Sequence, residues 1–229
     1  MPIKHSEKMI AALYSGGKDS TLALHKMHEQ GMEIDLLISM DSENDFSYMF
    51  HKPNIKWTAL QADAMQIKHV FFNTAGEKEA ELDDLERALT ENWVTELITG
   101  AVASTYQRDR INKLCEKLGI IHHAPLWGVD PLKELNELVL NFEVIISQVS
   151  AEGFDDRILG KRLDSNMIDR LIALNKKYKV NMSFEGGEAE SFVLDAPLFK
   201  KRIVINKAKT EWKGNVGIYK IEDAKLVDK

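Results

Sequence analysis

Short apolar runs alternate with segments of helical periodicity through the first half of the chain. The apolar runs predict buried strands at residues 10–14, 33–40, 67–72, 97–103 and 120–124. Between them, apolar side chains recur every three or four positions, which predicts helices at residues 19–30, 54–64, 77–93 and 105–118. Parallel strands need a crossing element to return the chain, so this order predicts an α/β fold, a parallel Rossmann-like sheet with helices on both faces.

The pattern changes after residue 125. A helix is expected from Pro131 and another at residues 165–178, with a strand at residues 144–149 between them. Apolar runs separated by Gly, Asn and Pro then predict antiparallel strands at residues 192–194, 202–205 and 216–221. We therefore expect two parts, an α/β domain at residues 1–130 and a smaller C-terminal α+β unit at residues 131–229.

Composition narrows the class of protein. The chain has 229 residues, of which 44% are apolar and 29% charged, as in a soluble globular protein. Its net charge of -6 provides no global positive field, which argues against nucleic acid as a partner. The single cysteine, Cys115, fits a reducing compartment. Without an apolar stretch of about 20 residues or an N-terminal signal, the chain is expected in the cytoplasm, away from membranes.

The strongest chemical signal is a glycine-containing loop between the first predicted strand and helix. Its residues are Ser15, Gly16, Gly17, Lys18, Asp19 and Ser20. Glycines let backbone N–H groups turn toward an anion, the helix N-terminus adds positive potential, and the serines and lysine supply further donors, so the loop suits phosphate. It lacks the spacing of the Walker loop, which disfavours hydrolysis of a γ-phosphate. An ordinary tight turn is the alternative.

A second loop joins consecutive glycines to three carboxylates. Its candidate residues are Glu185, Gly186, Gly187, Glu188 and Glu190. Two adjacent glycines are poor material for a helix or strand, which predicts a shaped loop. An acidic, solvated surface turn is the alternative interpretation.

A third candidate segment opens the helix that follows the fourth predicted strand. Its polar residues are Ser104, Tyr106, Gln107 and Arg110. The carboxyl ends of parallel strands are where ligands bind in such sheets, and Arg110 would there bridge phosphates. A helix cap at Ser104 with solvated arginines is the alternative.

These motifs resemble a known group of enzymes. SGGKDS at the end of the first strand is similar to the pyrophosphate loop of the N-type ATP pyrophosphatases, whose fold is adenine-nucleotide α-hydrolase-like. The chain resembles the diphthine-ammonia ligase family through SYMFHKPN (47–54), GEKEAEL (76–82), GAVASTYQRDR (100–110), EGGEAES (185–191) and DAPLFKKRIVI (195–205). The resemblance implies an ATP-binding first domain and a substrate-binding second unit.

The resemblance also assigns a reaction. A carboxylate of diphthine on elongation factor 2 would attack the α-phosphorus of ATP, ammonia would convert the acyl-adenylate to an amide, and AMP and pyrophosphate would leave. Asp19 would bind Mg²⁺. Catalytic roles would fall to Lys18, Asp19, Tyr106, Arg110 and Glu188. Nucleotide contacts would come from residues 15–20, Met40, Ser104 and Gln107. Substrate contacts would come from His51, Asn54, Lys78, Glu185, Gly186, Gly187 and Glu190.

The role of the second loop stays open among three chemistries. Its carboxylates would bind Mg²⁺, deprotonate ammonium, or face the trimethylammonium group of diphthine. The family form is closer to GEGGEYET, whereas this chain has Phe184, Ala189 and Ser191 at the differing positions, and so lacks an aromatic that would meet a cation.

Other functions within the same fold are a tRNA-modifying pyrophosphatase, an enzyme activating a small carboxylate, and an ATP sensor without catalysis. Thiolation of tRNA commonly draws on cysteine pairs, which one cysteine does not supply. A homodimer is also left open.

Overall fold

The first half of the chain forms a parallel sheet. The computed structural model describes residues 8–42, 54–74, 80–151, 153–155 and 157–229. The five strands lie in the order β3-β2-β1-β4-β5, and β1 pairs in parallel with both β2 and β4. Their bounds are β1 (Ile10–Leu13), β2 (Leu36–Ser42), β3 (Lys68–Thr74), β4 (Glu96–Ile98) and β5 (Ile121–His123). From β1 the sheet continues through β2 and β3 on one side and through β4 and β5 on the other. The carboxyl end of β1 is therefore the switch point where ligands bind in such sheets.

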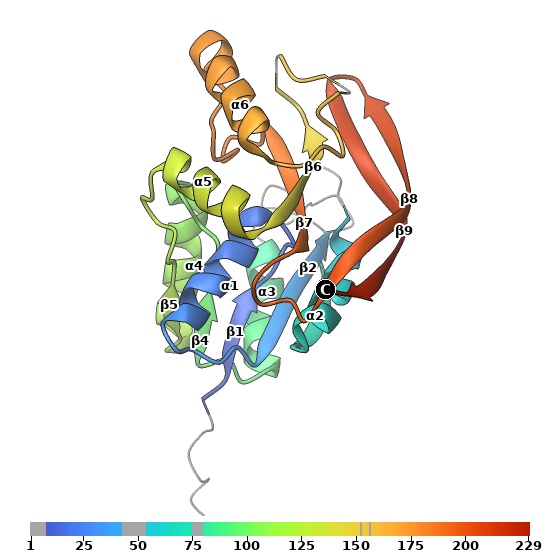
Figure 1. The fold of residues 1–229 in the computed structure, drawn as a ribbon. Helices are drawn as coiled ribbons and strands as arrows, with labels where there is room; N and C mark the ends of the chain where they lie inside the picture. Colours follow the sequence, from blue (N-terminus) through green and yellow to red (C-terminus); the bar gives the residue numbers. More distant parts are fainter. Residues whose placement is uncertain (1–7, 43–53, 75–79, 152, 156) are drawn as a thin grey trace, which may run out of the picture.

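Helices cover both faces of this sheet, as the alternating pattern predicts (Figure 1). Leu36 and Ile38 of β2 lie in one apolar cluster with α3 and α4, whereas Leu37 lies in another with α1 and α2. Successive residues of a strand point to opposite faces, so one buried run serves two cores. The helical bounds are α1 (Lys18–Glu29), the 3-10 helix η1 (Ile55–Trp57), α2 (Thr58–Met65), α3 (Ala80–Glu91) and α4 (Thr105–Leu118).

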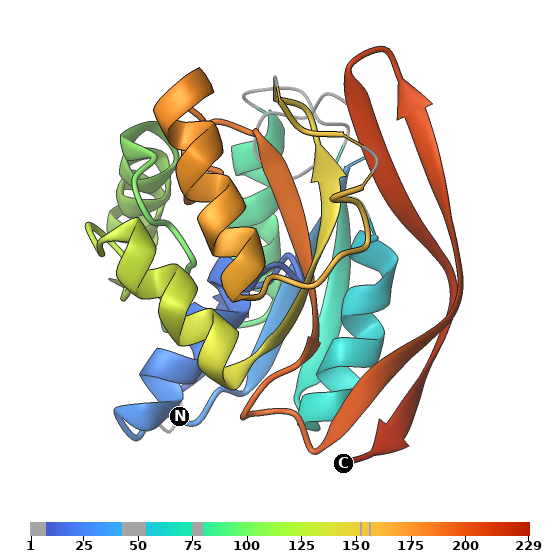
Figure 2. The same ribbon diagram turned by 45° about the horizontal axis from the view of Figure 1, so that its top comes forward.

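The C-terminal part forms a second, antiparallel sheet in the order β7-β6-β9-β8. Its elements are α5 (Pro131–Asn141), β6 (Glu143–Val149), α6 (Ser165–Tyr178), β7 (Ala189–Asp195), β8 (Lys201–Lys213) and β9 (Val216–Asp228). The apolar cluster beneath α1 and α2 continues into α5, α6, β6 and β7, so one core joins the two sheets (Figure 2). The division at residue 130 falls between β5 and α5 and stays a prediction.

The fourth strand and the last two strands differ in length from the predicted ones. The fourth strand ends at Ile98 instead of residue 103, and Gly100, which follows it, lies against the backbone of the first turn of α1. The last two strands run for 13 residues each as a ribbon that the apolar runs mark only in part. Charged pairs stabilise its exposed length, for example Lys207 with Glu222 at 2.8 Å, and such positions carry no hydrophobic signal.

Among the described residues, no helix combines the length and apolar character needed to cross a membrane.

A half-buried histidine of β3, His69, is expected to make the stability of the sheet depend on pH. His69 Nε2 lies 2.8 Å from Ser39 Oγ and 3.3 Å from Thr58 Oγ1. Burial lowers the pKa of His69 from 6.5 to about 4. The folded protein therefore holds this ring neutral where the unfolded chain would protonate it.

We expect the contribution of the neutral His69 ring to the free energy of unfolding to be fully present above pH 6.5 and to be lost as the pH falls toward 4. The free energy of unfolding of a His69→Gln variant, measured by urea denaturation, should depend less steeply on pH across this window than that of the parent. Replacing the exposed His28 by Gln is the control. Equal pH dependence in the parent and the His69 variant would contradict this account.

Candidate active site

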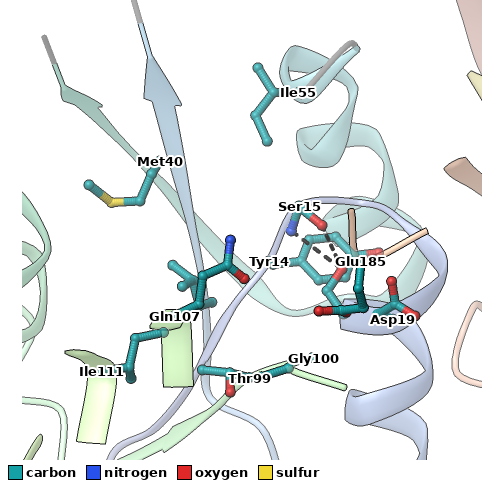
Figure 3. Close-up of a pocket in the computed structure, with 13 residues that line it drawn as sticks. Tyr14, Ser15, Asp19, Met40, Ile55, Thr99, Gly100, Gln107, Ile111 and Glu185 are labelled. Atoms are coloured by element: carbon teal, nitrogen blue, oxygen red, sulfur yellow. Dashed lines mark hydrogen bonds between the residues drawn. The ribbon is translucent and has the colours of Figure 1, made fainter. Parts of the chain in front are cut away.

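A pocket opens at the carboxyl ends of β1, β2 and β4, beside the first turn of α1. Its lining includes the apolar side chains of Leu13, Met40 and Ile111 and the polar side chains of Ser15, Asp19, Ser20 and Glu185. Met40 and Ile111 lie toward one end of the pocket, and Ser15, Asp19 and Glu185 lie toward the other (Figure 3). A site with one apolar and one anion-binding end matches a nucleotide, whose base is flat and weakly polar and whose other end is charged. The predicted nucleotide contacts Met40 and Gln107 both line this pocket.

The glycine loop is shaped by Gly16, which has φ +76°. A Cβ at this position would lie 2.4 Å from Gln61 Oε1, so both conformation and space favour glycine. The Gly16 carbonyl accepts hydrogen bonds from Val193 N and Gln61 Nε2, each at 3.0 Å. Gly17 is ordinary extended backbone with φ -82°. The loop is therefore fixed from outside by α2 and β7.

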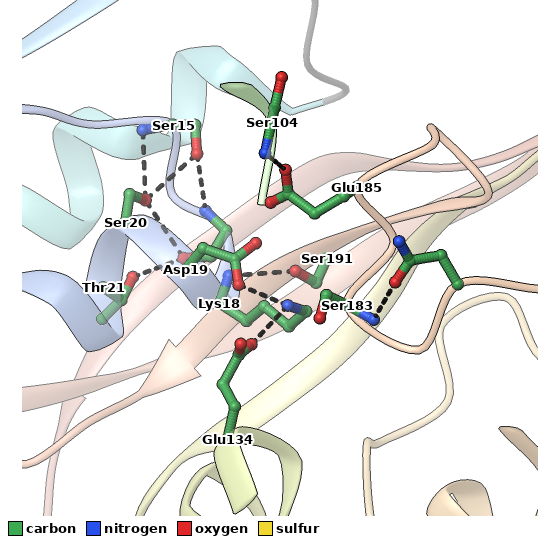
Figure 4. A network of polar contacts seen from close by, with 12 residues as sticks. Ser15, Lys18, Asp19, Ser20, Thr21, Ser104, Glu134, Ser183, Glu185 and Ser191 are labelled. Atoms are coloured by element: carbon green, nitrogen blue, oxygen red, sulfur yellow. Dashed lines mark hydrogen bonds and ion pairs between the residues drawn. The ribbon is translucent and has the colours of Figure 1, made fainter. Parts of the chain in front are cut away.

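The N-cap residue of α1, Gly17, has no side chain with which to cap the helix, and the positive end of the helix dipole points toward the polar end of the pocket. Ser15 Oγ and Ser20 Oγ lie 3.1 Å apart across the loop, and Lys18 N donates to Ser191 Oγ at 3.0 Å (Figure 4). Ser191 lies in β7 and is the last residue of the EGGEAES segment (185–191). The hydrogen bond thus joins two of the sequence motifs that carry the family resemblance.

Lys18 lies beneath the pocket and does not line it. Its side chain is 1% exposed and forms ion pairs with Asp19 and, at 2.7 Å, with Glu134 of α5 (Figure 4). Burial alone would lower the pKa of Lys18, but the two carboxylates outweigh it and hold that pKa above its usual range. The ammonium is charged, and its direct contact with phosphate stays a prediction.

Sequence reasoning missed Glu134 and Gln61. Burial and the nearby Asp19 carboxylate raise the pKa of Glu134, against the opposing effect of Lys18. A glutamate in the first turn of a helix ordinarily indicates an exposed residue that favours the helix dipole, so no signal marked this one as buried. Gln61, on the buried side of α2, was likewise unmarked.

The two glutamates that flank the glycines in the second loop have different surroundings. Glu185 lines the pocket, and its Oε2 accepts a hydrogen bond from Ser104 N at 3.1 Å. Burial, with Asp19 as the next largest contribution, raises the pKa of Glu185. Glu188 instead accepts hydrogen bonds from Asn181 N at 3.0 Å and Gly186 N at 2.9 Å. Glu188 therefore holds the loop together, and its predicted catalytic role is untested.

The rest of this loop completes the turn into the second sheet. Gly187 has φ +77°, which favours glycine, whereas Gly186 lies against the carboxylate of Glu188. Glu190 is already in β7, opposite Gln148. The shaped loop that the sequence predicts is confirmed, and substrate contacts for these residues stay predictions.

Substitution should separate these two roles. We expect Glu188→Gln to lower the free energy of unfolding by about 1–3 kcal/mol, because an amide cannot accept both backbone N–H groups through carboxylate oxygens. Glu185→Gln should leave stability nearly unchanged and reduce nucleotide turnover. Urea denaturation and release of pyrophosphate measure the two quantities. Equal effects of both variants on both quantities would contradict this division.

The residues on α4 are only partly brought to the pocket. Ser104 caps the helix, its Oγ accepting from Gln107 N at 3.4 Å, and Gln107 lines the pocket. Tyr106 and Arg110 do not line it, and the Arg110 guanidinium lies 5.1 Å from the centre of the Tyr106 ring. Their predicted catalytic roles remain predictions.

The remaining substrate candidates either do not line this pocket or fall outside the described residues. His51 and Lys78 fall outside the described residues. Asn54, at φ 67°, donates from Nδ2 to Tyr219 O at 2.9 Å and accepts from Ile221 N at 2.8 Å. Its amide therefore joins the segment before η1 to β9, and its contact with substrate stays a prediction.

The acidic side chains suit a metal ion that is held mainly by a nucleotide. Within the part of the chain that the structure describes, no group of three or more His, Cys, Asp or Glu residues is arranged to hold a metal by itself. Asp19 and Glu185 nevertheless share the polar end of the pocket. Mg²⁺ is commonly held by one or two carboxylates together with substrate phosphates, so this donor set fits it.

The C-terminal and N-terminal parts match two family models. The models describe the N-terminal domain of diphthamide synthase, over residues 8–122, and its C-terminal domain, over residues 130–227. A solved structure from Methanocaldococcus jannaschii, titled as a predicted subunit of tRNA methyltransferase, is 18% identical with a TM-score of 0.47. It covers 83% of this chain and 98% of its own, and its TM-score is below the level usual for a shared fold.

Curated relatives agree with the family models. A human protein named diphthine-ammonia ligase is 34% identical, and the match covers 87% of this chain and 83% of that protein. The relative of that name from Danio rerio is 32% identical, with 88% of both chains covered. The one from Schizosaccharomyces pombe is 34% identical, but this chain spans only 36% of its length. With both family models matched and relatives similar over most of the chain, this chain belongs to the diphthamide synthase family.

Proposed function

We propose that this chain is an ATP-dependent ligase that converts the carboxylate of diphthine to an amide, with elongation factor 2 as its protein substrate. The observation that carries the proposal is the pocket in which the SGGKDS loop and Glu185 of the EGGE loop form one polar end. Ammonia would be the nitrogen donor. Relatives similar over most of this chain bear the name diphthine-ammonia ligase.

The proposed reaction has two balanced steps. A carboxylate oxygen of diphthine attacks the α-phosphorus of ATP, and the bond from that phosphorus to pyrophosphate breaks. Ammonia then attacks the acyl carbon, the amide forms, and AMP leaves with the former carboxylate oxygen while one proton is released. The first step needs positive potential near the leaving pyrophosphate, and the second needs water excluded from the mixed anhydride.

The residues around the pocket would meet these needs as follows. Leu13, Met40 and Ile111 would contact the adenine, and the N-terminus of α1 with Ser15 and Ser20 would bind the phosphates. Asp19, with Glu185 beside it, would hold Mg²⁺, which supplies charge neutralisation on the phosphates.

Reconstitution tests this function. The protein should form AMP and pyrophosphate only when elongation factor 2 bearing diphthine, ammonium, ATP and Mg²⁺ are all present, and mass spectrometry should find the amide in the factor. Factor lacking diphthine is the control. Release of ADP, or AMP formation that ignores the factor, would overturn the proposal.

A thiolating enzyme is disfavoured by the state of the one cysteine. Cys115 is buried, and burial raises the pKa of its thiol to about 11. Such a thiol is a poor nucleophile at neutral pH and a poor carrier of sulfur. Tight ATP binding without any release of pyrophosphate in the reconstituted assay would instead favour the sensor.

A further inference from the structure

Two ion pairs join α1 to α5, and they differ in their surroundings. Lys26 Nζ lies 2.7 Å from Glu137, with side chains 24% and 31% exposed. Lys18 Nζ lies 2.7 Å from Glu134, with side chains 1% and 0% exposed. Only the second pair lies next to the pocket, through Asp19 (Figure 4). Both are lysine–glutamate pairs between the same two helices, so the exposed pair serves as a control for the buried pair beside the pocket.

Glu134 is held firmly in its place. Asp130 caps α5, its Oδ1 accepting from Leu132 N and Lys133 N at 3.0 Å each, and Pro131 begins the helix. The next residue, Leu135, is fully buried in the core shared with α1. Because the first turn of α5 is fixed in this way, the Glu134 carboxylate determines where the Lys18 ammonium lies.

Asp19 and Glu134 are not equivalent partners of Lys18. The Asp19 side chain is 29% exposed and lines the pocket, whereas that of Glu134 is 0% exposed. If Asp19 turns to a metal bound with the nucleotide, Lys18 loses one of its two counter-ions. A buried ammonium without a carboxylate is costly, so a second carboxylate that stays in place beside Lys18 makes the exchange feasible.

We propose that Glu134 is a positioning residue that holds Lys18 beneath the loop and so releases Asp19 to bind the metal-nucleotide complex. The inference rests on the proposed use of ATP. With Glu134 neutralised, Lys18 would depend on Asp19 alone and would compete with the metal for it. The substitution should therefore lower the apparent affinity for Mg²⁺ in the presence of nucleotide. It should change the fraction of folded protein much less.

The experiment measures binding of a fluorescent ATP analogue to the whole chain while Mg²⁺ is titrated. Glu134→Gln should require about 10-fold more Mg²⁺ for half-saturation, the size typical for a residue that supports a metal ligand, and saturating Mg²⁺ should restore most binding. Glu137→Gln, on the same helix, should match the parent. Glu134→Asp keeps a carboxylate and should recover part of the affinity.

Each outcome has a distinct meaning. If the parent binds and Glu134→Gln has the same Mg²⁺ dependence as Glu137→Gln, the inference is overturned while ATP use stands. A loss of binding sites that saturating Mg²⁺ does not restore would indicate a merely structural residue and would also overturn it. If Glu134→Gln fails to fold, Glu134→Asp decides, since unchanged Mg²⁺ dependence there would contradict the proposal. A parent that binds no nucleotide at any Mg²⁺ concentration would overturn both the inference and the proposed function.

Discussion

Replacing Gly100 by alanine should reduce kcat/KM for ATP-dependent AMP formation by about 100-fold. A Cβ at Gly100 would lie 2.6 Å from both the carbonyl carbon of Asp19 and the backbone nitrogen of Ser20. Backbone atoms cannot give way as a flexible side chain can, so the first turn of α1 must move away from β4. Displacements near 1 Å in a positioning element are enough for losses of this size. Release of AMP and pyrophosphate measures the effect.

Gly119→Ala is the matched control. Gly119 has φ +70°, but a Cβ there would meet nothing within 4 Å. The left-handed conformation should lower the free energy of unfolding by about 1–2 kcal/mol while the kinetic constants stay near those of the parent. If Gly100→Ala were equally active, the contact between Gly100 and the glycine loop would not position the nucleotide.

Removing the buried ammonium should have the largest effect on stability. Lys18→Met would leave Asp19 and Glu134 close together without their shared cation, and breaking a buried pair in this way costs about 3–5 kcal/mol of the free energy of unfolding. Urea denaturation at pH 7 measures the loss.

A double variant distinguishes the contribution of the Lys18–Glu134 ion pair to stability from that of the packing of the Lys18 methylene groups. Lys18→Met combined with Glu134→Leu replaces two charges by apolar groups and should recover much of the loss. A loss below about 1 kcal/mol for Lys18→Met alone, or no recovery in the double variant, would show that the Lys18–Glu134 pair is not the source of the stability.

The parallel sheet was predictable because its signal is local. The inner strands β1 and β2 are buried over most of their length, so each is written as an apolar run, and each crossing helix shows its own period. The edge strands β3 and β5 are less buried, but their apolar residues still mark them. The β8–β9 ribbon was predicted only where it meets the core, at residues such as Ile203 and Ile221. The outer part of the ribbon is stabilised by backbone hydrogen bonds and by pairs of opposite charges. The sequence of this part is therefore polar and resembles that of a loop.

Only the site residues that lie in a recognisable local sequence pattern were predictable. Ser15, Asp19, Ser20, Met40, Gln107 and Glu185 were predicted and line one pocket. Glu134 was not, because its partner Lys18 is 116 positions away and nothing local distinguishes a buried glutamate from a solvated one. The same limit applies to Glu188, since the sequence shows a carboxylate but not that two backbone N–H groups occupy it.

The central claim is that the glycine loop presents the α-phosphorus of ATP to a carboxylate. The most direct measurement starts from elongation factor 2 whose diphthine carboxylate carries ¹⁸O, treated with the protein, ATP, Mg²⁺ and ammonium. Mass spectrometry of the products should find one ¹⁸O in AMP for each amide formed, and none in pyrophosphate. Label in orthophosphate or pyrophosphate, or amide formed with unlabelled AMP, would contradict the account.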